Sequence, residues 1–97
     1  ERMFQMTFPD FSGKIVLIYL VNRSDDYNVV MQHATLENQA GKIFIVGEFA
    51  EGTTASDWAA GIRTAVSWEN VEQYLVFDSI EDYYSRMSIG WNDRTVQ

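Results

Sequence analysis

Few side chains in this sequence have the type and spacing that chemistry requires. His33 is the only histidine and cysteine is absent, and no Asp or Ser stands at a motif spacing that would make His33 a general base. We expect His33 to be structural, either packed or partly exposed. The acidic pairs Asp25-Asp26 and Glu81-Asp82 lack the spacing of a calcium loop and suit a turn and a helix start. The sequence predicts a non-enzymatic protein with no metal and no cofactor.

The predicted fold is organised around residues 62–77. In each of its two halves, residues 62–68 and 71–77, the side chains alternate between two sets with a period of two residues, which is typical of β-strands. The break between them is only Trp68-Glu69-Asn70, which is too short for an ordinary open hairpin. We interpret it as one strongly bent path that closes a small barrel.

Three stretches before this pair also have extended patterns. Residues 4–8 alternate until Pro9 stops the run, which favours an extended segment. Residues 14–21 are apolar on both faces, so they predict a central strand that is covered on each side. Residues 42–49 are nearly continuous in apolar side chains, and Gly47 within them indicates a bulge or a bend.

A further strand is predicted over residues 28–36, after a polar turn cluster. Strict alternation would place one apolar set, Val30, Ala34 and Leu36, on one face. It would place Val29, Met31 and His33 on the other face. Residues 37–41 are polar and end in glycine, so they predict the next reversal of the chain.

The remaining parts are one long connection and one helix. Residues 50–61 are small and polar, with Trp58 as the only large residue, which predicts variable chain. Ser79 and Asp82 suit a helix start over residues 79–88. The apolar stripe of that helix, which we expect to dock on the barrel rather than on a membrane, consists of Ile80, Tyr83, Tyr84 and Met87. Residues 89–97 are predicted to be a frayed tail.

Composition limits the possible partners. The 97 residues suit one domain, 1–97, with residues 1–12 as an N-terminal extension. There are 14 acidic and 7 basic residues, a formal net charge of −7, so the long-range field repels phosphate and no DNA binding is expected. No apolar run is long enough to span a bilayer, and no secretion signal is recognisable. We expect a soluble, cytoplasmic protein.

Two motifs resemble those of the Sm-like (LSm) family. Residues 13–20, GKIVLIYL, are similar to the first-strand pattern of Gly-Lys followed by alternating aliphatic residues. Residues 65–71, AVSWENV, lie where the second signature of the family would fall, with Ser67-Trp68 in place of its Arg-Gly pair. The order of strands is similar across residues 13–77. The resemblance implies a mainly β fold, a small five-stranded SH3-like barrel with a short C-terminal helix.

The resemblance also implies where RNA would bind. In the family, bases are held between the turn after the second strand and the Arg of the second signature. The corresponding residues here are Glu37, Gln39, Gly41, Ser67 and Trp68. Gly41 stands where the family has a base-reading Asn and the signature Arg is missing, so we expect weak, salt-tolerant RNA binding or none. Trp68 either stacks on a base, or fills the core or an interface as a plug.

In the family, the fourth and fifth strands are the edges through which subunits pair into a closed ring. Ring closure would also remove the free edge of an apolar strand such as residues 71–77, which would otherwise favour aggregation. The predicted interface consists of Val66, Val71, Gln73, Tyr74, Leu75 and Val76. Two alternatives stay open: a monomer in which the C-terminal helix covers this edge, and an acidic oligomeric scaffold that binds no nucleic acid.

Overall fold

The computed structural model describes residues 8–24 and 28–96, with side chains up to residue 88. The extended segment predicted over residues 4–8 lies outside the described residues except for Phe8, so it stays a prediction. Within the described ranges, no helix combines the length and the apolar character that crossing a membrane requires.

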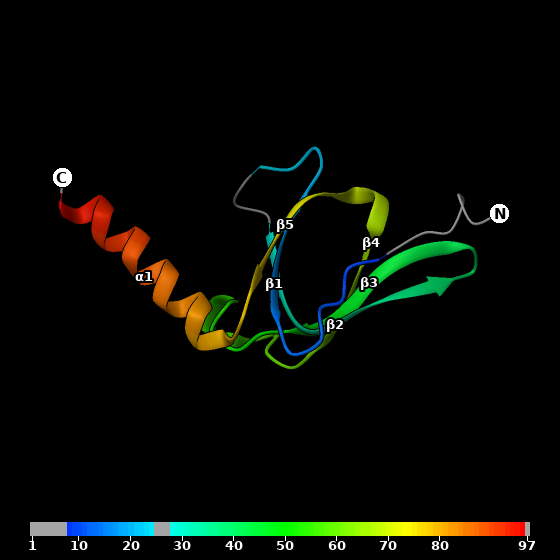
Figure 1. The fold of residues 1–97 in the computed structure, drawn as a ribbon, viewed down its shortest axis with the longest axis horizontal. Coiled ribbons are helices and arrows are strands. Elements are labelled where there is room, and N and C mark those ends of the chain that lie inside the picture. Colours follow the sequence, from blue (N-terminus) through cyan, green and yellow to red (C-terminus); the bar gives the residue numbers. More distant parts are fainter. Residues whose placement is uncertain (1–7, 25–27, 97) are drawn as a thin grey trace.

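One antiparallel sheet forms the body of the protein (Figure 1). Its strands are β1 (Ile15–Leu20), β2 (Asn28–Gln39), β3 (Lys42–Phe49), β4 (Arg63–Ser67) and β5 (Val71–Phe77), followed by the helix α1 (Ile80–Val96). The order of strands across the sheet is β4-β3-β2-β1-β5. The predicted mainly β fold with five strands and a C-terminal helix is confirmed. The sheet is not closed, because no described ladder joins β4 to β5.

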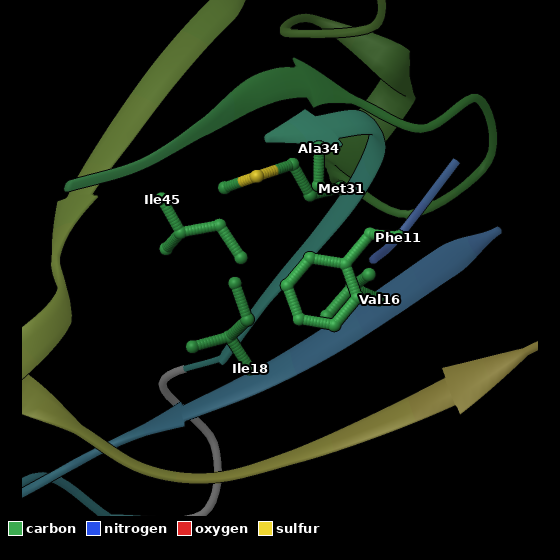
Figure 2. Close-up of a cluster of buried hydrophobic side chains, with 6 residues drawn as sticks. All are labelled: Phe11, Val16, Ile18, Met31, Ala34 and Ile45. Carbon is green, nitrogen blue, oxygen red and sulfur yellow. The ribbon is translucent and has the colours of Figure 1, made fainter. Parts of the chain in front are cut away.

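The core lies on both faces of β1. Val16 and Ile18 point into a first cluster with Phe11, Met31, Ala34 and Ile45 (Figure 2). The alternate residues Ile15 and Leu17 belong to a second cluster with Val30, Ala50 and Tyr83. Burying each such aliphatic side chain contributes about 1.5–3 kcal/mol to folding. The prediction of a strand covered on each side is confirmed for the four buried residues, Ile15 to Ile18.

A bulge in β2 changes which side chains share a face. The register with β3 shifts between Gln32 and Thr35, and His33 has a left-handed φ of 56°. Met31 and Ala34 therefore lie in the first cluster, whereas Val30 lies in the second. The prediction that Val30 shares a face with Ala34 and Leu36 was wrong, since one extra residue reverses the alternation.

Gly47 of β3 lies opposite this bulge, and its lack of a side chain is required there. A Cβ at this position would lie 2.5 Å from Met31 Cγ and 2.6 Å from the Gln32 carbonyl oxygen. The predicted irregularity at Gly47 is thus confirmed, although the extra residue belongs to the neighbouring strand.

The β2–β3 hairpin turns more tightly than predicted. Strand β2 continues to Gln39, and only Ala40 and Gly41, with φ of 54° and 88°, make the turn. Two successive positive φ values are typical of the turns that match the twist of a hairpin. Asn38 Oδ1 accepts a hydrogen bond from the Gly41 amide at 2.9 Å, which holds the turn.

The bent path predicted for residues 62–77 is present. The 3-10 helix η3 (Trp68–Asn70), here called the corner, links β4 and β5, which lie at opposite ends of the strand order. The amide of Val21 donates to the carbonyl oxygen of Asn70 at 2.9 Å, so the corner is fastened to the end of β1.

Helix α1 begins as predicted and ends later. Ser79 Oγ accepts a hydrogen bond from the Asp82 amide at 3.0 Å, as an N-cap does. Ile80 and Tyr83 pack against the second cluster, whereas Met87 is 54% exposed, so only the first part of the stripe docks. The predicted end at residue 88 was wrong, because the helix continues to Val96 and extends away from the sheet (Figure 1).

Candidate functional site

The β2–β3 turn and the corner enclose an open hollow of about 230 Å³. Its lining residues come from two segments that are distant in sequence: Gly41, Lys42, Ile43, Ser67, Trp68 and Glu69. Three of the five predicted RNA-contacting residues, Gly41, Ser67 and Trp68, therefore lie together. They do so because Phe44 of β3 pairs with Ser67 of β4, which aligns the start of one strand with the end of the other. We call this the corner hollow.

The other two predicted residues, Glu37 and Gln39, lie outside the lining of the corner hollow. Gln39 Nε2 donates to Glu37 Oε1 at 3.1 Å, and Arg63 Nη2 donates to Glu37 Oε2 at 3.1 Å. Both oxygens of the Glu37 carboxylate are thus engaged within the protein. A base edge would have to displace one of these partners, so Glu37 is poorly placed as the acidic group that reads a base.

Trp68 connects the hollow to the core. Its ring centroid lies 5.9 Å from that of Tyr74 at an interplanar angle of 40°, and Tyr74 in turn meets Phe11 edge-on at 5.4 Å. The side chain packs against the first cluster. Such aromatic pairs add about 0.5–1.5 kcal/mol each beyond the area they bury. This packing favours the plug interpretation of Trp68 over a free stacking platform.

The polar groups of the corner are partly satisfied. Lys42 Nζ lies 3.2 Å from Glu69 Oε2, so the cation that lines the corner hollow is paired with an anion that also lines it. Ser67 Oγ is buried and has no hydrogen-bond partner within residues 8–24 and 28–96. A buried hydroxyl without a partner carries a free-energy cost of roughly 1–3 kcal/mol. Because Ser67 Oγ is itself buried, this cost is borne by the fold, and the hydroxyl is not open to a ligand in the corner hollow.

A second hollow of about 350 Å³ lies on the other side of Ser67, between β4 and the end of β1. Its lining consists of Leu20, Val21, Asn22, Arg23, Ala65, Val66, Ser67 and Asn70. Ser67 therefore lines both hollows.

The predicted interface residues do not form one surface. Val66, Val71 and Tyr74 face inward and pack against the first cluster. Leu75 and Val76 are 40% and 46% exposed, and Gln73 is also exposed. Among the described residues β5 pairs with β1 alone and β4 with β3 alone, so one edge of each strand is free. The surface open to a neighbouring subunit therefore consists of the unpaired backbone edges of β4 and β5, together with the side chains of Leu75 and Val76.

Sequence reasoning missed three charged residues of this region. Lys42, Arg63 and Glu69 were not singled out, yet all three make ion pairs here, Lys42 with Glu69 and Arg63 with Glu37. The approach of Arg63 to Glu37 joins β4 to β2 across the intervening β3. No local pattern encodes a contact of that kind.

His33 makes a polar contact away from the corner. Its Nδ1 lies 3.2 Å from Glu48 Oε1, and hydrogen bonds from His33 and then from Gln32 lower the pKa of the Glu48 carboxyl. Within residues 8–24 and 28–96, no group of three or more acidic, histidine or cysteine side chains is arranged to hold a metal ion.

No protein-family model, curated protein or solved structure matches the chain.

Proposed function

We propose that the protein is a non-enzymatic, Sm-like subunit of a homo-oligomeric ring in the cytoplasm, in which β4 of one copy pairs with β5 of the next. The observation that carries this proposal is the placement of the free edges. β4 and β5 are the two ends of the strand order. A head-to-tail contact between two different edges generates a ring when the rotation closes. The absence of cysteine suits the cytoplasm.

The side chains of the two edges support pairing between them. β5 carries exposed Leu75 and Val76 next to its free edge, and an open edge with apolar side chains tends to associate. The one charged residue of β4 is Arg63 and the one charged residue of β5 is Glu72. Each edge strand thus carries a single charge, and Arg63 is already paired with Glu37, so little charge repulsion opposes the association of the two edges.

An edge variant tests the assembly. Val76→Lys places a charge on the free edge of β5, and we expect it to reduce the oligomer to monomers in light scattering, because lysine on an edge opposes strand pairing. Met87→Lys makes the same kind of change at an exposed site on α1 and is expected to keep the wild-type mass. Equal masses for both variants would remove the β4–β5 contact from the proposal.

Within the ring, the corner hollow is the proposed site of a weak RNA contact. Its support is the meeting of Gly41, Ser67 and Trp68 around an open space. Its lining cation, Lys42, is already paired with Glu69, so few counterions are released on binding and the dependence on salt is shallow.

Titration of short uridine-rich and adenine-rich RNA oligonucleotides at two ionic strengths tests this contact. The expected result is weak binding that changes little with salt. Tight binding that falls steeply with salt would mean that assembly gathers the dispersed basic residues into one surface.

The pairing of Lys42 also favours a second candidate function, an acidic ring that acts as a protein scaffold and binds no nucleic acid. The net charge of −7 points the same way. Absence of RNA binding at both ionic strengths, together with an intact oligomer, would select the scaffold.

A further inference from the structure

The connection between β3 and β4, residues 50–61, displays a tryptophan to solvent. Trp58 is 74% exposed, more than any other large hydrophobic side chain in the described part of the chain. It follows the 3-10 helix η2 (Ala55–Asp57) and precedes Ala59, which is fully buried. A tryptophan so presented is costly to leave in water and is a typical anchor of binding surfaces.

The backbone around Trp58 is fixed by hydrogen bonds at both ends of the connection. Asp57 Oδ1 accepts from the Gly52 amide at 2.5 Å, and Thr53 Oγ1 donates to the Ala50 carbonyl oxygen at 2.6 Å. The Gly61 amide donates to the carbonyl oxygen of Phe49 at 2.9 Å. A partner would therefore meet an indole carried on a fixed backbone, and less backbone entropy would be lost on binding.

The same turn holds two residues in an unfavourable conformation. Ser56 and Asp57 both have φ of 55° although neither is glycine, and side chains with a Cβ rarely adopt that region. Such strain persists where surrounding contacts impose it, often at binding sites. Here the strained pair directly precedes Trp58, so it determines how the indole is presented.

The connection that presents the indole is acidic and carries no cation of its own. Residues 50–61 contain Glu51 and Asp57 but no Lys or Arg, and Glu51 has no ion-pair partner among the described residues. The Tyr84 hydroxyl of α1 donates to the Glu51 carbonyl oxygen, so the connection lies against the start of the helix (Figure 1). Burial, and then the charges of Glu51 and Asp57, raise the pKa of Tyr84.

We propose that Trp58, together with Glu51 and Asp57 of the same connection, binds an arginine side chain in a basic segment of a partner protein. The guanidinium would lie over the indole face, as in cation–π contacts, while the two carboxylates supply the opposite charge. An anionic membrane surface would be repelled by the same carboxylates. No residue of this connection lines the corner hollow, so this proposal does not depend on RNA binding.

The test is an NMR titration of the uniformly ¹⁵N-labelled protein with the peptide acetyl-Gly-Arg-Gly-Arg-Gly-amide. The matched control peptide has citrulline in place of arginine and is neutral but similar in shape. We expect a saturable shift of the Trp58 indole signal and of the amides of residues 50–61 with the arginine peptide, and none with the citrulline peptide. Glu51→Gln should weaken binding about twofold to fivefold, as loss of an exposed charge contact does.

Two variants of Trp58 separate a cation–π contact from simple apolar contact, with the backbone amides as the readout. Trp58→Phe keeps an aromatic face and should retain weakened binding, whereas Trp58→Leu keeps apolar surface only and should lose it. Ile62→Leu, a nearby exposed apolar position, should leave the affinity unchanged.

Three results would overturn the proposal. The first is an equal response to the citrulline peptide or an equal affinity of Trp58→Leu. The second is a shift of the Trp58 signal on dilution of the protein alone, which would mean that a second copy covers the ring. The third is binding of Trp58 to phosphatidylcholine or phosphatidylserine vesicles in preference to the arginine peptide.

Discussion

The two tryptophans on either side of β4 differ in how far their side chains are buried. Trp68, at the corner, packs on Tyr74 and the first cluster, whereas Trp58, in the connection, is 74% exposed. The corner joins two strands from opposite ends of the sheet, and a large ring fills the space where they approach. In the connection, Ala50 and Ala59 are fully buried, so two small side chains hold its backbone against the rest of the protein while Trp58 faces solvent.

The largest expected loss of stability comes from changing Tyr83, which packs in the second cluster with Ala50 of the connection. Tyr83 is 7% exposed and meets Phe77 edge-on at 5.3 Å. Tyr83→Asp would bury an unpaired charge beside Ala50, and we expect it to lower the free energy of unfolding by about 3 kcal/mol or more. Thermal unfolding followed by circular dichroism measures this. Met87→Asp puts the same charge on the exposed part of α1, and an equal loss there would contradict docking by Tyr83.

The next effect concerns the corner. Trp68→Ala removes a half-buried ring from the first cluster, and we expect a loss of about 2–4 kcal/mol, somewhat below that of a fully buried aromatic. Urea unfolding followed by circular dichroism gives the value without relying on tryptophan fluorescence. Trp68→Phe, which keeps a ring against Tyr74, should recover part of it. A loss under about 0.5 kcal/mol, the range of ordinary surface changes, would mean that Trp68 is not a plug.

A smaller effect on stability is expected from Glu48, near the end of β3, and it should depend on pH. The pKa of Glu48 is lowered from its ordinary 4.5, first by the hydrogen bond with His33 and then by that with Gln32. A carboxyl with a lower pKa in the folded state stabilises the fold above the unfolded pKa, and this contribution is lost as the pH falls through the folded value. Stability measured from pH 6 down to pH 3, about where free carboxyls titrate, should fall less steeply in Glu48→Gln. An unchanged slope would show that this contact has no energetic role.

The smallest effect completes the comparison of the two tryptophans. Trp58→Ala should change the free energy of unfolding by less than about 0.5 kcal/mol, because the exposed ring supports nothing beneath it. The same urea measurement serves for both tryptophans. A loss comparable to that of Trp68→Ala would mean that Trp58 packs in the folded protein, and the binding surface proposed for it would be withdrawn.

Local patterns in the sequence predicted the strands and the start of the helix, because alternation and capping act over a few residues. The faces of β2 were not predictable from β2 alone, since the bulge at His33 depends on Gly47 of the neighbouring strand. The helix was predicted to end early because its apolar stripe stops at Met87, whereas the helix continues to Val96.

The candidate site was predictable only in part. Gly41, Ser67 and Trp68 were chosen together by resemblance, and they line one hollow. The ion pairs of Arg63 with Glu37 and of Lys42 with Glu69 depend on tertiary placement, which spacing along the chain does not encode. The exposure of Trp58 depends in the same way on which small residues of the connection face the core.

The central claim is that the free edges of β4 and β5 associate head to tail. Size-exclusion chromatography with light scattering at micromolar concentration tests it most directly. We predict one discrete species whose mass is at least three times the 11.2 kDa of the chain and which persists on dilution, as a closed ring does. A mass of 11.2 kDa, or of a two-fold dimer, would contradict it.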